Sequence, residues 1–473
     1  MKRKKVNALG FALLVSLALC LSGCDGGEEE DVVKLRVANW EEYIDEGEWD
    51  EEDAIEFSDG YVLCPEGSIV EDFENWYYET YGRKVKVEYS TFGTNEELYN
   101  QITIGDVYDL ACPSEYMIMK MLREGMLTPY SDGFYDESDP RNYYAIGVSP
   151  FIADVYEDLT IDGEKLNKYA AGYMWGTLGI VYNPEEITKE QASSWSILSD
   201  PGLKRRITIK DSVRDAYFSA VSTYFYDEIT SKEFVESEDY ADRLYECLNR
   251  TDKETVDGVE KILSEIKGNV YSFETDSGKA DMVTGKVVAN QQWSGDAVYT
   301  MDQADEDGVE LCYAVPLEST NLWFDGWVLL KKGLDEDPNK QQAAEAFVNF
   351  ISMPENAVRN MTYVGYTSVI SGGESDRVLE FVDDAYGADP EEEEEELVEY
   401  DVSYFFGEDK DAVILTTEDQ CRRQLYAQYP SQDVVDRSAV MACFDKEGNE
   451  RINRMWTNVR CFDLKKWFSK FKE

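Results

Sequence analysis

The chain has 473 residues, of which 98 are Asp or Glu, 45 are Lys or Arg and none is His, so its formal net charge is −53. Such an acidic chain is repelled by nucleic-acid phosphate and anionic lipid. The absence of imidazole excludes catalysis by a Ser-His or Cys-His pair and any metal site that needs His as a ligand. A hydrophobic fraction of 43% and an aromatic fraction of 13% nevertheless predict a folded protein, and the length predicts at least two domains.

The N-terminus has the pattern of an export signal. Residues 2–5 are basic, residues 8–21 form an apolar run, and small residues then precede Cys24. This resembles a bacterial lipoprotein signal, which implies cleavage before Cys24 and attachment of a lipid to its thiol. The apolar run is shorter than the roughly 18 residues that a spanning helix needs. Residues 1–23 are therefore predicted to be a signal peptide and residues 24–33 an acidic linker to an exported body.

Strand and helix signals alternate along that body. Residues 35–40 are predicted to form a strand, and Ser68 with Glu71 forms a capping-box pattern that begins a helix ending before Gly82. Further strands are predicted at 84–89, 108–112 and 206–210, and further helices at 95–105, 114–124, 212–225 and 294–303. The alternation predicts α/β layers, and no repeat of fixed period is visible.

Two acidic segments interrupt this alternation, at residues 45–67 and at residues 371–428. The second contains six consecutive glutamates at 391–396. These glutamates could collect calcium, but a solvated, self-repelling loop is favoured because carboxylates need turn geometry to share one ion. The purpose of both segments stays open.

Seven cysteines follow the predicted lipid site, and their spacing matches no metal or redox motif. Cys112 and Cys312 lie in apolar, strand-like runs and are expected to be buried free thiols. A bridge among Cys421, Cys443 and Cys461 stays open, since export would permit disulfides.

Aromatic residues and carboxylates are interleaved at the ends of the predicted strands. Ligands of open α/β sheets collect at the carboxyl ends of strands and between lobes. Aromatic faces attract an organic ammonium group, and carboxylates neutralise it and accept its protons. The pattern therefore indicates a receptor for an organic cation. Its clusters lie at residues 39–43, 113–116, 211–215, 293–296 and 321–325.

Six motifs follow one another along the chain, at residues 40–44, 109–116, 173–177, 293–297, 321–325 and 364–367. In this order they resemble the spermidine/putrescine-binding lipoproteins of bacterial polyamine ABC transporters. The resemblance extends from about residue 35 to residue 367 and returns weakly from 429 to 459.

The resemblance implies an α/β, two-lobed periplasmic-binding-protein-like fold of type II. Each lobe would be a central sheet flanked by helices, and two chain crossings near Gly172 and Pro316 would form the hinge. The implied first lobe is 34–172 with 317–373, and the implied second lobe is 173–316 with 374–473, the latter carrying the acidic insertion at about 371–428.

The resemblance also implies a ligand-binding set. Asp296 and Asp325 would hold ammonium groups, Trp293 would stack on the methylene chain, and Trp323 would pack beside the second acid. Asp325 is the strongest candidate, because burying it without a cation would be costly. The other implied contacts are Trp40, Glu42, Tyr43, Ser114, Tyr116, Asp215 and Tyr366.

The sequence departs from the family pattern in ways that bear on ligand length. Asp215 stands where the family usually has Glu, and Ser212 stands where some spermidine binders carry an acid. Asp296 is associated more with putrescine binders. The four acids Glu42, Asp215, Asp296 and Asp325 give a formal site charge of about −4, which slightly favours spermidine, about +3, over putrescine, about +2. The choice between them stays open.

The implied function is capture of a polyamine outside the membrane, on the extracellular or periplasmic side, and delivery to the permease subunits of an ABC transporter. The implied protein is a monomer without catalytic activity, cofactor, metal or nucleic-acid partner, held to the membrane by its lipid alone. Alternatives are a receptor of the same fold for another organic cation, for ferric ion or for a sugar, a carboxylate-based glycosidase, and an adhesive surface protein. Acids beside aromatics on both lobes favour one ligand with more than one positive charge.

Overall fold

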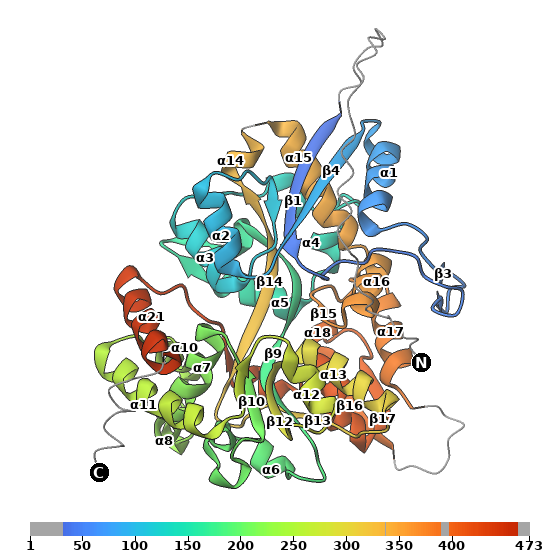
Figure 1. The fold of residues 1–473 in the computed structure, drawn as a ribbon. Coiled ribbons are helices and arrows are strands. Elements are labelled where there is room, and N and C mark those ends of the chain that lie inside the picture. The colour runs from blue at the N-terminus through green and yellow to red at the C-terminus, as the bar shows by residue number, and fades with distance from the viewer. Residues whose placement is uncertain (1–31, 336, 389–396, 462–473) are drawn as a thin grey trace, which may run out of the picture.

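The computed structural model describes residues 32–335, 337–388 and 397–461. Its main sheet follows the strand order β11-β10-β12-β9-β14-β5-β1-β4, with helices packed around it (Figure 1). This is the predicted α/β architecture. The predicted signal peptide, Cys24 and the glutamate run at 391–396 lie outside the described residues.

The first half of the sheet is built as the sequence predicts. Strand β1 (Val33–Trp40) pairs in parallel with β4 (Val85–Phe92) and with β5 (Leu110–Ala111). Helix α1 (Ile69–Tyr81) begins at the Ser68 capping box and ends at Gly82, whose φ of 67° is a left-handed conformation that glycine adopts without strain. Helices α2 (Asn95–Ile104) and α3 (Glu115–Arg123) follow.

The second half of the sheet contains β10 (Ile207–Lys210), β11 (Ser272–Glu274) and β12 (Ala289–Trp293). Helix α7 (Val213–Tyr224) follows β10, and α13 (Ser294–Glu306) follows β12. Both helices therefore begin at the carboxyl ends of neighbouring strands, which is where the sequence places Asp215 and Asp296. Further helices are α10 (Tyr240–Leu248), α11 (Lys253–Asn269), α12 (Ser277–Val283), α15 (Pro338–Ile351) and α21 (Lys446–Arg460).

Two long antiparallel strands, β9 (Ala170–Tyr182) and β14 (Thr320–Leu330), run from one half of the molecule to the other (Figure 1). Every residue of both strands is buried. On β9 the hydrophobic residues up to Trp175 belong to one core cluster, and those from Leu178 onward belong to others. The change of core therefore falls a few residues after Gly172, and the hinge itself stays a prediction.

The two acidic segments contact each other, which the sequence did not indicate. The first forms a small hairpin of β2 (Ile55–Glu56) and β3 (Val62–Leu63). The second contributes helix α17 (Arg377–Tyr386), whose Arg377 guanidinium lies 2.8 Å from the Asp59 carboxylate of the hairpin. Segments more than 300 residues apart thus share one surface.

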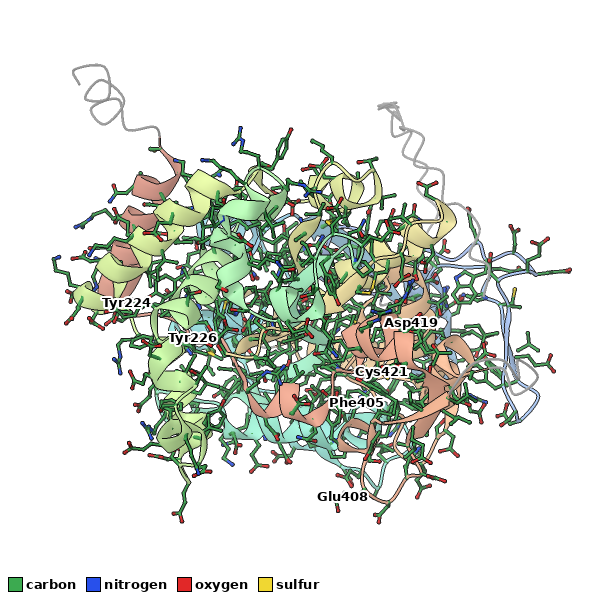
Figure 2. All side chains as sticks on the ribbon, turned by 90° about the horizontal axis from the view of Figure 1, so that it is seen from below. Tyr224, Tyr226, Phe405, Glu408, Asp419 and Cys421 are labelled. Carbon is green, nitrogen blue, oxygen red and sulfur yellow. The ribbon has the colours of Figure 1, made fainter. Side chains whose placement is uncertain are left out.

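The second segment packs on both halves of the molecule. Helix α17 contacts α16 (Pro354–Val364), and α18 (Ser403–Phe406) contacts α5 (Pro150–Asp158), both from the first half. Helix α19 (Gln424–Gln428) contacts α13 of the second half. Figure 2 shows Phe405 and Cys421 on the side away from Tyr224 and Tyr226. Phe405 stacks on Trp175, and both belong to the first hydrophobic cluster. The assignment of residues 374–473 to the second lobe stays a prediction.

All seven cysteines that the structure describes are free. Cys112 and Cys312 are buried, as predicted. Cys421, Cys443 and Cys461 form no bridge with one another in the described part of the chain.

Candidate ligand-binding site

Asp325 is a buried carboxylate in the middle of β14, where a bulge interrupts the pairing with β9. The Tyr43 hydroxyl donates to its Oδ2 at 2.8 Å, and the Ser114 hydroxyl donates to its Oδ1 at 2.7 Å. Asn95 in turn donates to the Ser114 hydroxyl at 3.0 Å and fixes its direction. Burial raises the pKa of Asp325 to about 6, although both hydroxyl donors act against the shift.

Asp325 has no cationic partner within the described ranges, since no Lys or Arg nitrogen there lies within 4.0 Å of it. Hydrogen bonds from two neutral hydroxyl groups do not offset the free-energy cost of removing a charged carboxylate from water. The site is therefore one that a cation would stabilise.

Aromatic rings surround this carboxylate. The ring centroid of Tyr366 lies 5.4 Å from that of Tyr43 and 5.5 Å from that of Trp323. Two glycines make room for these rings. A Cβ on Gly176 would lie 2.6 Å from the Trp323 ring, and a Cβ on Gly295 would collide with the Tyr366 ring.

The second half of the molecule supplies Asp215 and Trp293. The Trp293 indole Nε1 donates to Asp215 Oδ1 at 3.1 Å. Burial raises the pKa of Asp215, while hydrogen bonds from Ser212 and Trp293 oppose the shift. Trp293 and Tyr116 each pack against both large hydrophobic clusters, so this part of the site lies between the two cores.

Asp296 is neutralised within the protein. The Lys210 Nζ donates to its Oδ2 at 3.0 Å, the Tyr366 hydroxyl donates to its Oδ1 at 3.0 Å, and the Lys279 Nζ lies 3.6 Å away. Burial opposes ionisation of Asp296, but the charges of both lysines outweigh it and hold its pKa below the usual value. Asp296 thus differs from Asp325 and Asp215.

Two predicted residues lie apart from this cluster. Trp40 is half-buried and packs on Phe92 with ring centroids 4.7 Å apart, and its indole Nε1 has no hydrogen-bond partner among the described residues. Glu42 is exposed, and its φ of 53° is left-handed. Of the four acids expected to face the ligand, the structure leaves Glu42 exposed to solvent and pairs Asp296 with Lys210. The expected site charge of about −4 stays a prediction.

Three residues of the site were missed from the sequence. Glu115 is 2% exposed, its Oε2 has no hydrogen-bond partner among the described residues, and burial together with the charge of Asp325 raises its pKa. The Arg214 guanidinium lies 4.6 Å from the centroid of the Tyr116 ring. Lys210 pairs with Asp296. All three lie at or directly after predicted strand ends, and that position was the available signal.

Two α/β halves joined by two long strands, with a buried uncompensated acid and aromatic rings between them, define a two-lobed binding-protein fold of type II. The chain belongs to the family of bacterial extracellular solute-binding proteins, whose model matches residues 68–381. The resemblance found in the motifs is thereby confirmed.

Relatives of known function agree with this assignment. The spermidine/putrescine-binding periplasmic protein of Salmonella typhimurium is 24% identical over 363 residues, which are 75% of this chain and 82% of that protein. A putrescine-binding periplasmic protein of Escherichia coli is 23% identical over 60% of this chain and 71% of its own length.

Solved structures show the same fold. The substrate-binding protein of the spermidine/putrescine ABC transporter of Streptococcus pneumoniae has a TM-score of 0.58 at 24% identity, covering 90% of this chain and 98% of that one. A lipoprotein of Treponema pallidum has a TM-score of 0.59 at 17% identity, covering 91% and 99%.

In the described part of the chain, no helix has both the length and the hydrophobicity that a membrane span requires. No group of three or more Cys, Asp or Glu side chains there is arranged to hold a metal ion.

Proposed function

We propose that this protein captures a polyamine outside the cytoplasmic membrane and delivers it to the permease of an ABC transporter. The observation that carries the proposal is Asp325, a buried carboxylate with hydroxyl donors, aromatic neighbours and no cation of its own within the described chain. The names of the relatives support the same ligand class. The protein acts as a monomeric receptor and performs no chemistry on its ligand.

The ligand lies between the two lobes with one ammonium group on Asp325. Tyr43 and Ser114 hold that carboxylate in place, and the rings of Trp323 and Tyr366 cover the adjacent carbon chain. A polyamine joins positive charges by apolar methylene groups, so it matches carboxylates that alternate with aromatic faces.

Calorimetric titration with putrescine, spermidine, spermine and a neutral oligosaccharide tests the proposal. Binding of at least one amine, with no heat from the oligosaccharide, is the expected result. Binding of the sugar alone would contradict the proposal, because the charge of Asp325 would then have no role.

Amine binding should weaken by about tenfold between pH 7 and pH 5. Burial raises the pKa of Asp325 to about 6, so its charged form falls from most of the population to about a tenth of it over this range. The amines stay protonated at both pH values, since their pKa values are near that of lysine. Titrations at the two pH values measure the effect, and an unchanged affinity would argue against Asp325 as the ammonium acceptor.

Polyamine should close the two lobes on each other. Asp325 lies on β14 with the first core, whereas Asp215 and Trp293 lie on the second half, so only a closed arrangement lets one ligand reach all three. We expect the radius of gyration in solution scattering to fall on addition of saturating putrescine. Asp325→Asn with the same ligand is the control. Equal scattering curves for the wild type with and without putrescine would contradict closure.

The lipid anchor on Cys24 completes the proposal. The basic, apolar and small-residue pattern before Cys24 supports it, and this region lies outside the described residues. Cys24→Ala should move the protein from the membrane fraction to the soluble exported fraction, as an immunoblot of both fractions would show. A variant that stays in the membrane fraction would contradict anchoring through this thiol.

A further inference from the structure

The ammonium group of Lys210 already sits in the kind of surroundings expected for a ligand. Its side chain is 1% exposed, and Nζ donates to Asp296 Oδ2 at 3.0 Å and to the Thr275 carbonyl at 3.0 Å. It also lies 4.4 Å from the centroid of the Trp293 ring. A carboxylate, a carbonyl and an aromatic face are the groups that bind an organic ammonium.

We propose that Lys210 permanently occupies one ammonium position of the site, so that the ligand is a dication such as a short diamine and Lys210 determines this specificity. The inference rests on the proposed function, because it concerns the same site. It reverses the expectation that four free acids favour spermidine.

The remaining charges agree with a dication. Three buried acids, Asp325, Asp215 and Glu115, have no Lys or Arg nitrogen within 4.0 Å in the part of the chain that the structure describes. Arg214 adds one positive charge that acts on Glu115 and on Asp215. The formal charge facing a ligand is therefore −2 with Glu115 ionised and −1 with Glu115 protonated, the form that burial and the charge of Asp325 favour by raising its pKa. Neither value calls for the third charge of spermidine.

The position of Glu115 fits a ligand that extends from Asp325 toward Asp215. Glu115 is 2% exposed, its Oε2 has no hydrogen-bond partner among the described residues, and the charges of Asp325 and Asp215, one from each half of the molecule, both raise its pKa. A diamine lying between them would also compensate Glu115. A ligand ammonium on Asp296 Oδ2 would have to displace Lys210, whose side chain is almost wholly buried.

A purely structural ion pair is the alternative role for Lys210. The two roles differ in a measurable way. A structural lysine affects both amines equally when it is replaced, whereas a lysine that supplies a ligand charge changes the ratio of the two affinities.

The test is calorimetric titration of four proteins with putrescine and with spermidine. The proteins are the wild type, Lys210→Met, the double variant Lys210→Met with Asp296→Asn, and Lys286→Met. Lys286 is a matched control, because it pairs with Asp281 at 2.9 Å and lies 4.6 Å from the Tyr271 ring, remote from the site. Circular dichroism verifies that each variant is folded.

We expect the wild type to bind putrescine at least as tightly as spermidine. Lys210→Met removes the positive charge that faces Asp296 and Glu274 and so makes the site more negative by one charge. It should raise the spermidine-to-putrescine affinity ratio about tenfold or more. The double variant removes both charges and should return the ratio to near that of the wild type. Lys286→Met should leave it unchanged.

Tighter wild-type binding of spermidine by about tenfold would overturn the inference while leaving the proposed function intact. Equal changes for both amines in Lys210→Met would do the same. If no protein binds either amine, the proposed function fails and this inference fails with it. The wild-type comparison needs no variant, so it decides even if Lys210→Met does not fold.

Discussion

Asp325→Asn should reduce polyamine affinity by about 30-fold to several thousand-fold, corresponding to about 2–5 kcal/mol for loss of one partner of a buried charge pair. The reason is that Asp325 is the buried acid at the centre of the proposed site, with Tyr43 and Ser114 donating to it and no cation beside it in the described chain. Calorimetric titration measures the loss. Ser114→Ala is the control, since it removes one neutral donor and keeps the charge, and equal losses in the two variants would contradict this role.

The same substitution should stabilise the ligand-free protein. The pKa of Asp325 is raised from an ordinary value near 4 to about 6 in the folded state, so the folded state binds more protons than the unfolded state between these values. Stability due to this group is therefore lost as pH rises from about 4 to about 6. At pH 7 Asp325→Asn should recover up to about 3 kcal/mol of unfolding free energy, measurable by chemical denaturation. A destabilised variant at pH 7 would contradict the assignment.

Arg359→Met should lower the free energy of unfolding by about 3–5 kcal/mol. The Arg359 guanidinium is 3% exposed and forms ion pairs with Asp45, which is fully buried, and with Asp72 at 2.7 Å. Because Asp45 follows β1 and Arg359 lies on α16, the pair ties the first acidic segment to the core. Removal of the guanidinium leaves a buried carboxylate without its cation.

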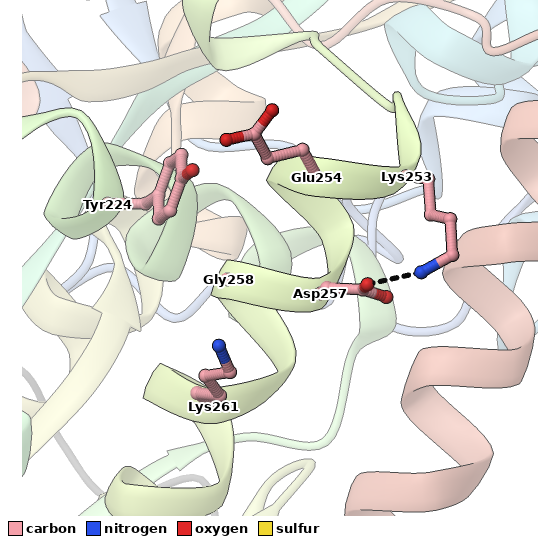
Figure 3. Close-up of a pocket in the computed structure, with 6 residues that line it drawn as sticks. All are labelled: Tyr224, Lys253, Glu254, Asp257, Gly258 and Lys261. Atoms are coloured by element: carbon pink, nitrogen blue, oxygen red, sulfur yellow. Dashed lines mark hydrogen bonds and ion pairs between the residues drawn. The ribbon is translucent and has the colours of Figure 1, made fainter.

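Lys253→Met is the matched control for this effect. Lys253 pairs with Asp257 on α11 (Figure 3). Both side chains are more than half exposed. Exposed pairs contribute only about 0–1 kcal/mol, so this variant should unfold near the wild-type denaturant midpoint. Similar denaturant midpoints for Arg359→Met and Lys253→Met would show that the buried ion pairs of Arg359 contribute nothing to the free energy of unfolding.

Local patterns predicted the elements that position the site. The capping box at Ser68 and the glycine at 82 marked both ends of α1, and strand signals located the ends of β1, β5 and β10. Asp325 was identified because an acid inside an apolar strand has no surface role. Each of these inferences uses residues that are near neighbours in the chain.

Contacts between distant segments were beyond such reasoning. Lys210 and Asp296 are 86 residues apart, and their pairing depends on β10 lying beside β12. Arg377 and Asp59 are 318 residues apart in the sequence. Neither acidic segment has a sequence pattern that predicts contact with the other. The family resemblance placed Glu42 in the site, but the left-handed backbone there leaves its side chain in solvent.

The structure of the complex with putrescine tests the central claim most directly. The account predicts one ligand ammonium within hydrogen-bond distance of Asp325, a carbon chain against the rings of Trp323 and Tyr366, and Lys210 still paired with Asp296. A ligand bound away from Asp325 would contradict the proposed site. A ligand ammonium on Asp296, with Lys210 displaced, would contradict the assignment of that position to the lysine.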